Sequence, residues 1–518
     1  MSKLSQNEIE SILSARFKDD EITELKQLPR FEKLKDIKKA SLKIIEYLKA
    51  GKKVSIVGDY DVDGVTSSVI LSEFFDDIGL KYELIIPNRF KDGYGLSEKI
   101  LPRINTDLVI TVDNGISAVN TAKKCKDQGI TLIITDHHKT PPILPDAYAI
   151  VNPKQEKCEF EFSDICGAQV AWYLCASIKS ELGIEYNLGK FLDILCISIT
   201  ADMMPLIGMN RVMVQSGIKV LNNSKRVFVK AIKDMFDKDE ITFDDLSFLV
   251  SPLLNSSGRM YDAIYSYDFL SSKNYTKAYE ILSQIAEFNS NRKEVQNSIT
   301  DQAKDMSKGT NSDIIVVYKE DWHEGVIGIV ASKLTVYFKK PAIVFSVSDG
   351  IAKGSARSVG DVDIYNLISK CKKYLLGFGG HKSAAGLGLK LENMQDFIND
   401  INSYASALDK EQFISNENIL CELDIDIVDL SLVDILKKYE PYGIQNPRPS
   451  FTLNQERILN KQLLGREKNH QKLYLKNNIE LLDFNFDVER FEGDELNIEC
   501  TVSKNEFRGQ VKPILISV

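Results

Sequence analysis

The stretch Val54–Gly64, VSIVGDYDVDG, decides the fold class of this chain. Its first four residues are mostly apolar, and Asp59, Asp61 and Asp63 follow within a few positions. An apolar run that ends in polar residues and glycine predicts a buried β-strand followed by a loop. Because carboxylates this close together repel one another, something must compensate for them.

The same pattern recurs twice along the chain. TDLVITVDNGISA (106–118) is an apolar run that ends at Asp113, and ITLIITDHH (130–138) is another that ends in an aspartate and two histidines. The segments 66–79 and 118–129 have the apolar spacing of helices and end at glycine. Strands that alternate with helices predict a parallel sheet with helices packed on it.

Ligands of such sheets bind beyond the carboxyl ends of the strands. One more aspartate, Asp202, interrupts the apolar segment DILCISITADMMPLIG (193–208). We therefore expect the acids and imidazoles of these segments to converge in one crevice. The converging residues are Asp59, Asp61, Asp63, Asp113, Asp136, His137 and His138, with Asp202 as a further candidate.

Each motif taken alone has a simpler interpretation. Asp63-Gly64 and Asp113-Asn114-Gly115 are typical of turns, and any single aspartate here is a candidate helix N-cap. Three strand ends with the same residue types favour a site instead, since two of the five histidines of the chain lie at one of them. A cluster of divalent cations would compensate for the carboxylates.

The residue types indicate which cations and which chemistry. Carboxylates with one or two imidazoles suit Mn²⁺, or Mg²⁺ with water in the remaining positions. One carboxylate shared by two cations is the usual device of a two-metal site, with the ions about 3.5–4 Å apart. Such a pair binds phosphate oxygens and activates water near neutral pH. The predicted chemistry is hydrolysis of a phosphoester or phosphoanhydride.

Composition limits the class of protein. The 518 residues exceed one ordinary core, so about two to four domains are expected. The net charge of −9 argues weakly against a nucleic-acid partner, but acids committed to metal ions do not count against a local positive channel. The eight cysteines form no CxxC pair, no apolar run is long enough for a membrane, and the N-terminal segment lacks a signal-peptide core. These features predict reduced thiols, no membrane partner and a cytoplasmic location.

Several motifs together resemble the DHH phosphoesterase superfamily and, within it, the RecJ family of bacterial single-strand-specific exonucleases. ITDHH (134–138) is similar to the superfamily signature. The resemblance extends over nearly the whole chain from about Arg30. Its other motifs are GDYDVDGVTSS (58–68), TVDNGISA (111–118), TADMMPL (200–206), NSSGRM (255–260), EGVIGIVASKL (324–334), KGSARS (353–358), GFGGHKSAAGLGL (377–389) and EPYGIQNPRPSF (440–451).

The resemblance implies roles for individual residues of the predicted crevice. The implied metal ligands are Asp61, Asp63, Asp113, His137 and Asp202, with Asp59 as a ligand or as a partner of one. His138 resembles the phosphate-contacting histidine of the family, and Arg259 is expected to contact a phosphate near the metals. Asp136 is expected to orient a histidine, because carboxylates behind metal sites commonly do so. Two departures, Ser256-Ser257 in place of alanines and a looser fourth motif, keep the functional residue types.

The resemblance also implies a substrate polarity. In the family, the counterparts of Arg89, Ser355 and Arg357 hold the 5′-phosphate of the substrate, and guanidinium groups bind phosphate oxygens bidentately. From sequence alone, Arg89 reads more simply as a surface charge. The glycine-rich motif with Gly380, His381 and Lys382 is either a tight structural turn or a loop that approaches a phosphate chain; we favour the loop.

The predicted fold class is α/β: a parallel-sheet DHH domain, joined by a long helix to a smaller α/β DHHA1 domain and followed by a C-terminal OB-type β-barrel. The strong apolar periodicity of 277–306 is the basis for the long helix. The expected boundaries are a helical extension (1–30), the DHH domain (31–220), a helical connector (221–310), the DHHA1 domain (311–415) and the OB domain (416–518).

The C-terminal region shows five β-like runs and carries more acidic than basic residues. Any single-strand-binding groove on it must therefore be a local patch. The loop GREKNHQK (465–472) offers the candidates Arg466, Lys468, His470 and Lys472, although a solvated hairpin loop explains it equally well.

The leading functional hypothesis is a metal-dependent exonuclease that removes 5′-mononucleotides from single-stranded DNA, with two Mn²⁺ or Mg²⁺ ions. The resemblance implies a role in recombination and repair, with single-strand-binding protein and a helicase as partners of a monomeric enzyme. One alternative is a DHH-type hydrolase of very short oligonucleotides or cyclic dinucleotides; the extra C-terminal domain argues for a polymer. A second is a scaffold without activity, against which the complete set of ligand types argues.

Overall fold

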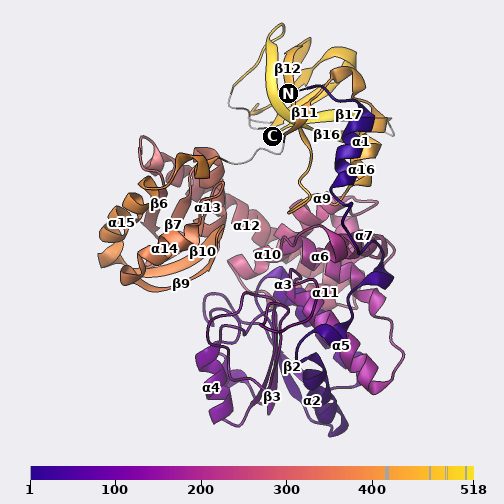
Figure 1. Ribbon diagram of the computed structural model, residues 1–518, viewed down its shortest axis with the longest axis vertical. Coiled ribbons are helices and arrows are strands. Elements are labelled where there is room, and N and C mark those ends of the chain that lie inside the picture. The colour runs from indigo at the N-terminus through magenta and orange to yellow at the C-terminus, as the bar shows by residue number, and fades with distance from the viewer. Residues whose placement is uncertain (1, 415–418, 466–467, 485, 487, 508–509) are drawn as a thin grey trace.

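Three β-sheets, each with its own hydrophobic core, organise the chain (Figure 1). The computed structural model describes residues 2–414, 419–465, 468–484, 486, 488–507 and 510–518. Across this part of the chain, every helix is too short or too polar to span a lipid bilayer.

The first sheet is parallel, as the sequence predicts, and its strand order is β2-β1-β3-β4-β5. Its strands are β1 (Val54–Val57), β2 (Tyr82–Ile85), β3 (Leu108–Val112), β4 (Thr131–Thr135) and β5 (Ala149–Val151). All residues of β1 and β3 are buried, because helices cover both faces of the sheet. The covering helices are α2 (Ile37–Lys49), α3 (Val62–Ile78) and α5 (Gly167–Leu182) on one face and α4 (Val119–Asp127) on the other.

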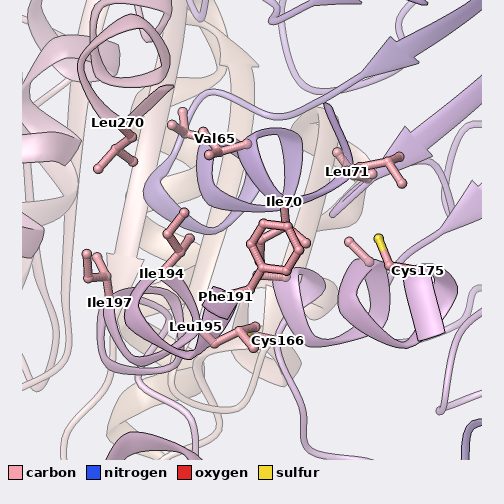
Figure 2. Packing of buried hydrophobic residues seen from close by; sticks show 14 of the residues in the cluster. Val65, Ile70, Leu71, Cys166, Cys175, Phe191, Ile194, Leu195, Ile197 and Leu270 are labelled. Atoms are coloured by element: carbon pink, nitrogen blue, oxygen red, sulfur yellow. The ribbon is translucent and has the colours of Figure 1, made fainter. Parts of the chain in front are cut away.

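A helical layer continues from this sheet toward the second one. It contains α6 (Leu192–Ala201), α7 (Gly208–Asn222), α8 (Val227–Phe236), α9 (Phe243–Asp245), the π-helical turn η5 (Leu246–Val250), α10 (Ser251–Met260) and α11 (Ile264–Ser271). Figure 2 shows Ile194 of α6 and Leu270 of α11 packing in one core with Val65 of α3. The predicted long helix is α12 (Tyr275–Ser307), whose 33 residues extend about 50 Å at the usual rise per residue.

The second sheet has the strand order β6-β7-β8-β10-β9 and is antiparallel except for the pair β6–β7. Its strands are β6 (Ile315–Glu320), β7 (Ala342–Ser348), β8 (Ile351–Arg357), β9 (Leu375–His381) and β10 (Ala384–Lys390). Its helices are α13 (Ile327–Phe338), α14 (Ile364–Lys370) and α15 (Met394–Ser406). The glycine-rich motif was predicted as a loop, and this is wrong: it forms the β9–β10 hairpin, with His381 paired to Ala384.

The third sheet has seven strands in the order β11-β12-β16-β17-β15-β14-β13, rather than the five predicted from apolar runs. They are β11 (Ile419–Glu422), β12 (Ser450–Arg457), β13 (Asn460–Leu464), β14 (His470–Tyr474), β15 (Glu480–Phe484), β16 (Glu495–Phe507) and β17 (Gln510–Ser517). The sequence reading missed β12 and β13 because few of their residues are buried. It also extended β11 too far, into α16 (Leu430–Lys438).

The N-terminal helix α1 (Gln6–Ala15) packs on this third unit, beside α16 (Figure 1). Ile9 and Leu13 are fully buried in the core of the third sheet. The Arg16 guanidinium donates hydrogen bonds to the Asn446 side chain at 3.1 Å and to the Pro447 carbonyl at 2.6 Å. The first residues of the chain therefore join a domain that lies some four hundred residues away in sequence.

Candidate metal centre

The strand ends of the first sheet gather acidic side chains into one buried centre. Asp59 follows β1, Asp113 follows β3 and Asp136 follows β4, and each is almost fully buried. Asp113 has a backbone φ of 62°, a left-handed conformation that is uncommon outside glycine. A strained backbone kept at a strand end is typical of a residue whose side-chain direction matters.

Asp61 and Asp63 enter the centre from the start of α3. Asp61 caps the helix, since its Oδ1 accepts a hydrogen bond from the Gly64 amide at 3.1 Å. The N-cap interpretation is therefore correct for this residue, but the cap uses only one carboxylate oxygen. Asp63 accepts hydrogen bonds from the Gly167 and Ala168 amides at the start of α5 and from the Ser198 hydroxyl. The amino end of α5 thus stabilises the Asp63 carboxylate.

Two glycines allow the carboxylates to come this close. A Cβ on Gly64 would lie 2.6 Å from the Cβ of Asp59, and a Cβ on Gly167 would lie 2.5 Å from the Cβ of Asp113. Both distances are far below normal van der Waals contact. The centre is therefore built around positions where a side chain of any size would displace an aspartate.

His137 lies at the middle of the acidic residues. Its Nε2 is 3.1 Å from an oxygen of Asp113, 3.6 Å from Asp63 and 3.5 Å from Asp202. Asp202 comes from the end of α6, where it is the C-cap. Three groups of donor atoms have all members within 4.8 Å of one another: Asp63 with His137 and Asp202, Asp59 with Asp61 and Asp113, and Asp113 with His137 and His138. Because Asp113 and His137 each belong to two groups, the geometry suits two neighbouring cations.

Electrostatics gives the same indication. Burial raises the pKa of Asp59, Asp113 and Asp202 well above the usual range, and the neighbouring carboxylates raise it further. Three buried carboxylate oxygens, Asp59 Oδ1, Asp113 Oδ1 and Asp202 Oδ2, accept no hydrogen bond from the described residues. Buried acceptors of this kind are rare unless a ligand satisfies them. The donor set therefore fits Mn²⁺ or Mg²⁺.

Asp136 holds the two histidines. Its Oδ1 accepts from the amides of His137 and His138 and lies 2.7 Å from His138 Nδ1, and its Oδ2 accepts from the Ile116 amide at 2.8 Å. Burial opposes ionisation of Asp136, but His138 outweighs it and lowers the pKa of the carboxyl. Burial likewise disfavours a charged His138, yet the bond to Asp136 raises the pKa of His138 to about 9. His138 is therefore cationic at neutral pH, with Nε2 as the nitrogen left for a substrate.

The predicted phosphate-binding arginines lie around this centre. The Arg89 guanidinium stacks 4.0 Å from the Tyr60 ring centroid, and its Nε donates to the Gly258 carbonyl at 3.3 Å. Arg259 is buried near Arg89, and burial together with this neighbouring cation lowers the pKa of Arg259 to about 10. Arg357 is also among the cations that lower it. In the described part of the chain, no carboxylate forms an ion pair with any of these three arginines.

Ser355 and Arg357 lie on the same face of β8, and the Arg357 guanidinium donates to the Ser355 hydroxyl at 3.0 Å. A Cβ on Gly328, in the first turn of α13, would lie about 3 Å from both side chains. The amino end of that helix therefore faces the pair, an arrangement typical of anion binding.

The remaining predicted substrate residues are less clearly placed at a site. His381 is near Arg357, which together with burial lowers the pKa of the imidazole. Gly380 lies in the β9–β10 hairpin, where a Cβ would lie 2.3 Å from the Ala384 carbonyl. Lys382 forms an exposed ion pair with Asp361 at 2.7 Å.

The candidates on the third unit divide in the same way. Lys472 is paired with Glu480 at 2.9 Å, and the His470 ring lies 5.4 Å from that of Phe484. Lys468 adopts a left-handed backbone conformation. Arg466 lies outside the described residues.

Sequence reasoning missed Tyr60 and Arg292. Tyr60 stands inside the quoted motif, between two of its aspartates, so its stacking on Arg89 had a signal in its position. Arg292 is one arginine on the long, polar helix α12, and its burial gave no signal in the sequence.

Comparisons with known proteins agree with this geometry. A model of the DHH family N-terminal domain matches residues 53–199, a DHHA1 domain model matches 311–407 and a RecJ OB domain model matches 419–517. The match to these three domains confirms the predicted resemblance and the predicted order of domain types.

Two curated relatives are named single-stranded-DNA-specific exonuclease RecJ. The protein of Bacillus subtilis is 33% identical over 499 residues, which are 93% of this chain, and this chain spans 63% of its length. The protein of Haemophilus influenzae is 30% identical over 525 residues, which cover 94% of this chain and 90% of that protein.

The crystal structure of RecJ in complex with Mn²⁺ from Thermus thermophilus superposes on the whole chain, covering 78% of that protein, with a TM-score of 0.83 at 23% identity. The predicted fold class is thereby confirmed. This chain belongs to the RecJ family of single-stranded-DNA-specific exonucleases.

Proposed function

We propose that this chain hydrolyses single-stranded DNA from the 5′ end and releases 5′-mononucleotides. One observation carries the proposal: buried carboxylate oxygens without hydrogen-bond partners among the described residues lie beside arginines without carboxylate partners there. The first group requires cations and the second requires anions. A phosphodiester bound together with divalent metal ions satisfies both.

The chain's own residues define where two cations would lie. Asp63, His137 and Asp202 form one group of donors, and Asp59 with Asp61 forms the other. Asp113 is close to both groups and is the candidate bridging ligand. Two Mn²⁺ or Mg²⁺ ions bound there would polarise the phosphate and supply activated water.

The surrounding side chains would bind and stabilise the phosphate that is attacked. His138 carries a proton at neutral pH and would donate a hydrogen bond from Nε2 to a phosphate oxygen. Asp136 holds the ring of His138 in that orientation through Nδ1. Arg259, which is buried next to the centre, would neutralise charge that develops on the phosphate.

A second set of residues would set the polarity of the reaction. Arg89, Ser355 and Arg357 offer donors to a terminal phosphate, and Gly328 leaves room in front of them. A terminal phosphate held there, with the next phosphate at the metal ions, places the bond of the 5′-terminal nucleotide in reach. Gly380 and His381 of the hairpin are candidate contacts of the same end, and Lys382 would have to leave Asp361 to join them.

Activity on very short oligonucleotides or cyclic dinucleotides remains the alternative. The third unit favours a polymer, since a hydrolase of such small substrates has no use for an additional domain beyond the two α/β units. We further propose a role in DNA recombination and repair, with single-strand-binding protein and a helicase as partners, a monomeric state and a cytoplasmic location. The five-part division of the chain at residues 30, 220, 310 and 415 belongs to the same proposal.

The test is hydrolysis of a 5′-phosphorylated, 3′-labelled single strand in Mn²⁺, beside the same strand in duplex form and in EDTA. Loss of nucleotides from the 5′ end of the single strand alone, abolished by EDTA, is the expected result. Turnover restricted to strands of two to four nucleotides, which is about the length that two subsites hold, would favour the alternative. No turnover of either substrate would contradict the proposal.

A further inference from the structure

A second cavity adjoins the metal centre and has no role in the function proposed so far. It has a volume of about 410 Å³. The end of α6, the turn η5, α10, α12, α13 and the segment 442–444 line it. Thr200 and Ala201, which directly precede Asp202, and the phosphate-contact candidate Arg259 belong to its wall. A ligand in this cavity would therefore be a neighbour of a phosphate at the metal ions.

The inner wall is positively charged and lacks a counter-charge. Arg292 of α12 is only 9% exposed and lines the cavity with Arg259. Its guanidinium donates to Asn289 Oδ1 at 3.0 and 3.1 Å and to Gln296 Oε1 at 2.8 Å. These neutral amides orient the guanidinium without neutralising it, and no described carboxylate pairs with it. A buried cation without a partner is costly, which indicates a site for an anion.

A buried hydroxyl in the same wall also lacks a partner. Ser251 is 5% exposed, lines the cavity, and its Oγ forms no hydrogen bond with the described residues. Together with the two arginines it offers donors in the arrangement that phosphate oxygens require.

The mouth of the cavity carries large apolar side chains that are exposed. Phe248 of η5 is 81% exposed and Met203 is 67% exposed, and they come from separate elements. Met203 has a left-handed φ of 53°, and η5 is a π-helical turn, a feature frequent at functional sites. An exposed aromatic ring beside a phosphate site is the usual platform for a nucleic-acid base.

The position of the cavity fixes which nucleotide it would take. None of the 5′-phosphate candidates Arg89, Ser355 and Arg357 belongs to its wall. Its rim includes Gly443 and Ile444, and the Ile444 carbonyl accepts a hydrogen bond from the Leu206 amide at 2.8 Å. This segment leads into the third sheet. A strand that passes from the 5′ pocket over the metal ions would continue through this cavity toward the third unit.

We propose that this cavity binds the nucleotide on the 3′ side of the cleaved bond: Arg292 and Arg259 bind its 3′-phosphate, and Phe248 stacks on its base. The inference rests on the proposed exonuclease function and adds a subsite to it. Arg292 and Phe248 are then positioning residues that hold the departing strand, and the rate on longer strands depends on them.

The first experiment removes the phosphate and the arginine separately. Wild type and Arg292→Gln are compared on a 5′-phosphorylated trithymidylate and on the same strand with a neutral methylphosphonate between nucleotides two and three. On the natural strand we expect kcat/KM of Arg292→Gln to fall about 10- to 100-fold, as for a lost hydrogen bond to a charged group. On the methylphosphonate strand we expect both enzymes to agree within about threefold, because the phosphate charge is already absent. Equal losses on both strands would overturn the assignment.

The second experiment uses an exposed residue whose truncation cannot disturb the core. Phe248→Ala should lower kcat/KM about 5- to 100-fold on the natural strand, as for a lost stacking contact. It should have no effect on a strand with an abasic second nucleotide, and Phe248→Tyr should restore the rate. Val336→Ala (78% exposed) and Arg30→Gln are the matched controls on distant surfaces. An effect of Phe248→Ala that persists on the abasic strand would refute the stacking role.

Failure of the exonuclease function is distinguishable from failure of this subsite. If wild type hydrolyses neither strand, the proposed function is wrong, and calorimetric binding of both trinucleotides with Ca²⁺ then decides on the cavity. A preference of wild type for the natural strand of about tenfold or more, lost in Arg292→Gln, would support the subsite. A preference that Arg292→Gln retains would overturn it.

Discussion

Gly167→Ala is a small change that tests whether close packing sets the geometry of the metal centre. The added Cβ would lie 2.5 Å from the Cβ of Asp113 and 2.6 Å from its Oδ1. Ordinary carbon–carbon contact is about 3.5–4.0 Å, so Asp113 or α5 must move by about 1 Å or more. A displacement of about 1 Å in a reacting group costs on the order of 100-fold in rate.

The cost in stability should be much smaller than the cost in activity. Overpacking costs about 1–3 kcal/mol, and alanine in a helix recovers up to about 1 kcal/mol relative to glycine. The unfolding midpoint should therefore shift by only a few degrees, while kcat/KM falls about 100-fold and Mn²⁺ affinity falls with it. Calorimetric Mn²⁺ titration, thermal unfolding in EDTA and the strand assay measure the three quantities.

The matched control is Gly388→Ala, which adds the same methyl group where the nearest atom is 3.9 Å away. It should leave Mn²⁺ affinity and rate unchanged. If Gly167→Ala also kept both within about twofold, the steric account of how Asp113 is positioned would be refuted.

Three further predictions concern charge, polarity and the N-terminal helix. Asp113→Asn should abolish hydrolysis, and in EDTA it should stabilise the protein by an amount that grows as the pH rises, because the raised pKa of Asp113 makes its ionised form destabilising; thermal unfolding across pH detects this. Arg357→Gln should reduce the preference for a 5′-phosphate over a 5′-hydroxyl about 10- to 100-fold, and an unchanged preference would remove Arg357 from the terminal pocket. Leu13→Ala should destabilise the third unit by about 2–5 kcal/mol, while Mn²⁺ affinity stays constant; denaturant unfolding and calorimetry check the two.

The strand ends of the first sheet could be predicted because one local pattern encodes them. The runs that became β1, β3 and β4 are buried on both faces, so each reads as a continuous apolar segment that stops at its polar end. The rule that parallel strands present their carboxyl ends at one edge then brought Asp59, Asp113 and His137 together without any knowledge of distances.

The parts that escaped prediction depend on contacts between distant segments. Strands β12 and β13 are half exposed, so their apolar signal is weak, and the sheet that includes them is recognisable only once the strands pair. The glycines of β9 and β10 read as a loop because their neighbours in the hairpin are not visible in the local sequence. Arg292 reads as one more polar residue of α12 until the wall of the second cavity surrounds it.

The N-terminal helix shows the same limit. Its amphipathic pattern and its Ser5 capping box are local, and they identify a helix. The partner of its apolar face, the core of the third sheet, lies at the other end of the chain, and only the folded structure relates the two.

The central claim is that the carboxylates around Asp113 and His137 hold two divalent cations. Anomalous X-ray diffraction from crystals grown with Mn²⁺ tests it most directly. The account predicts two manganese peaks about 3.5–4 Å apart, both within coordination distance of Asp113, with Asp63, His137 and Asp202 around one and Asp59 and Asp61 around the other. A single peak away from Asp113, or no peak at all in this centre, would contradict it.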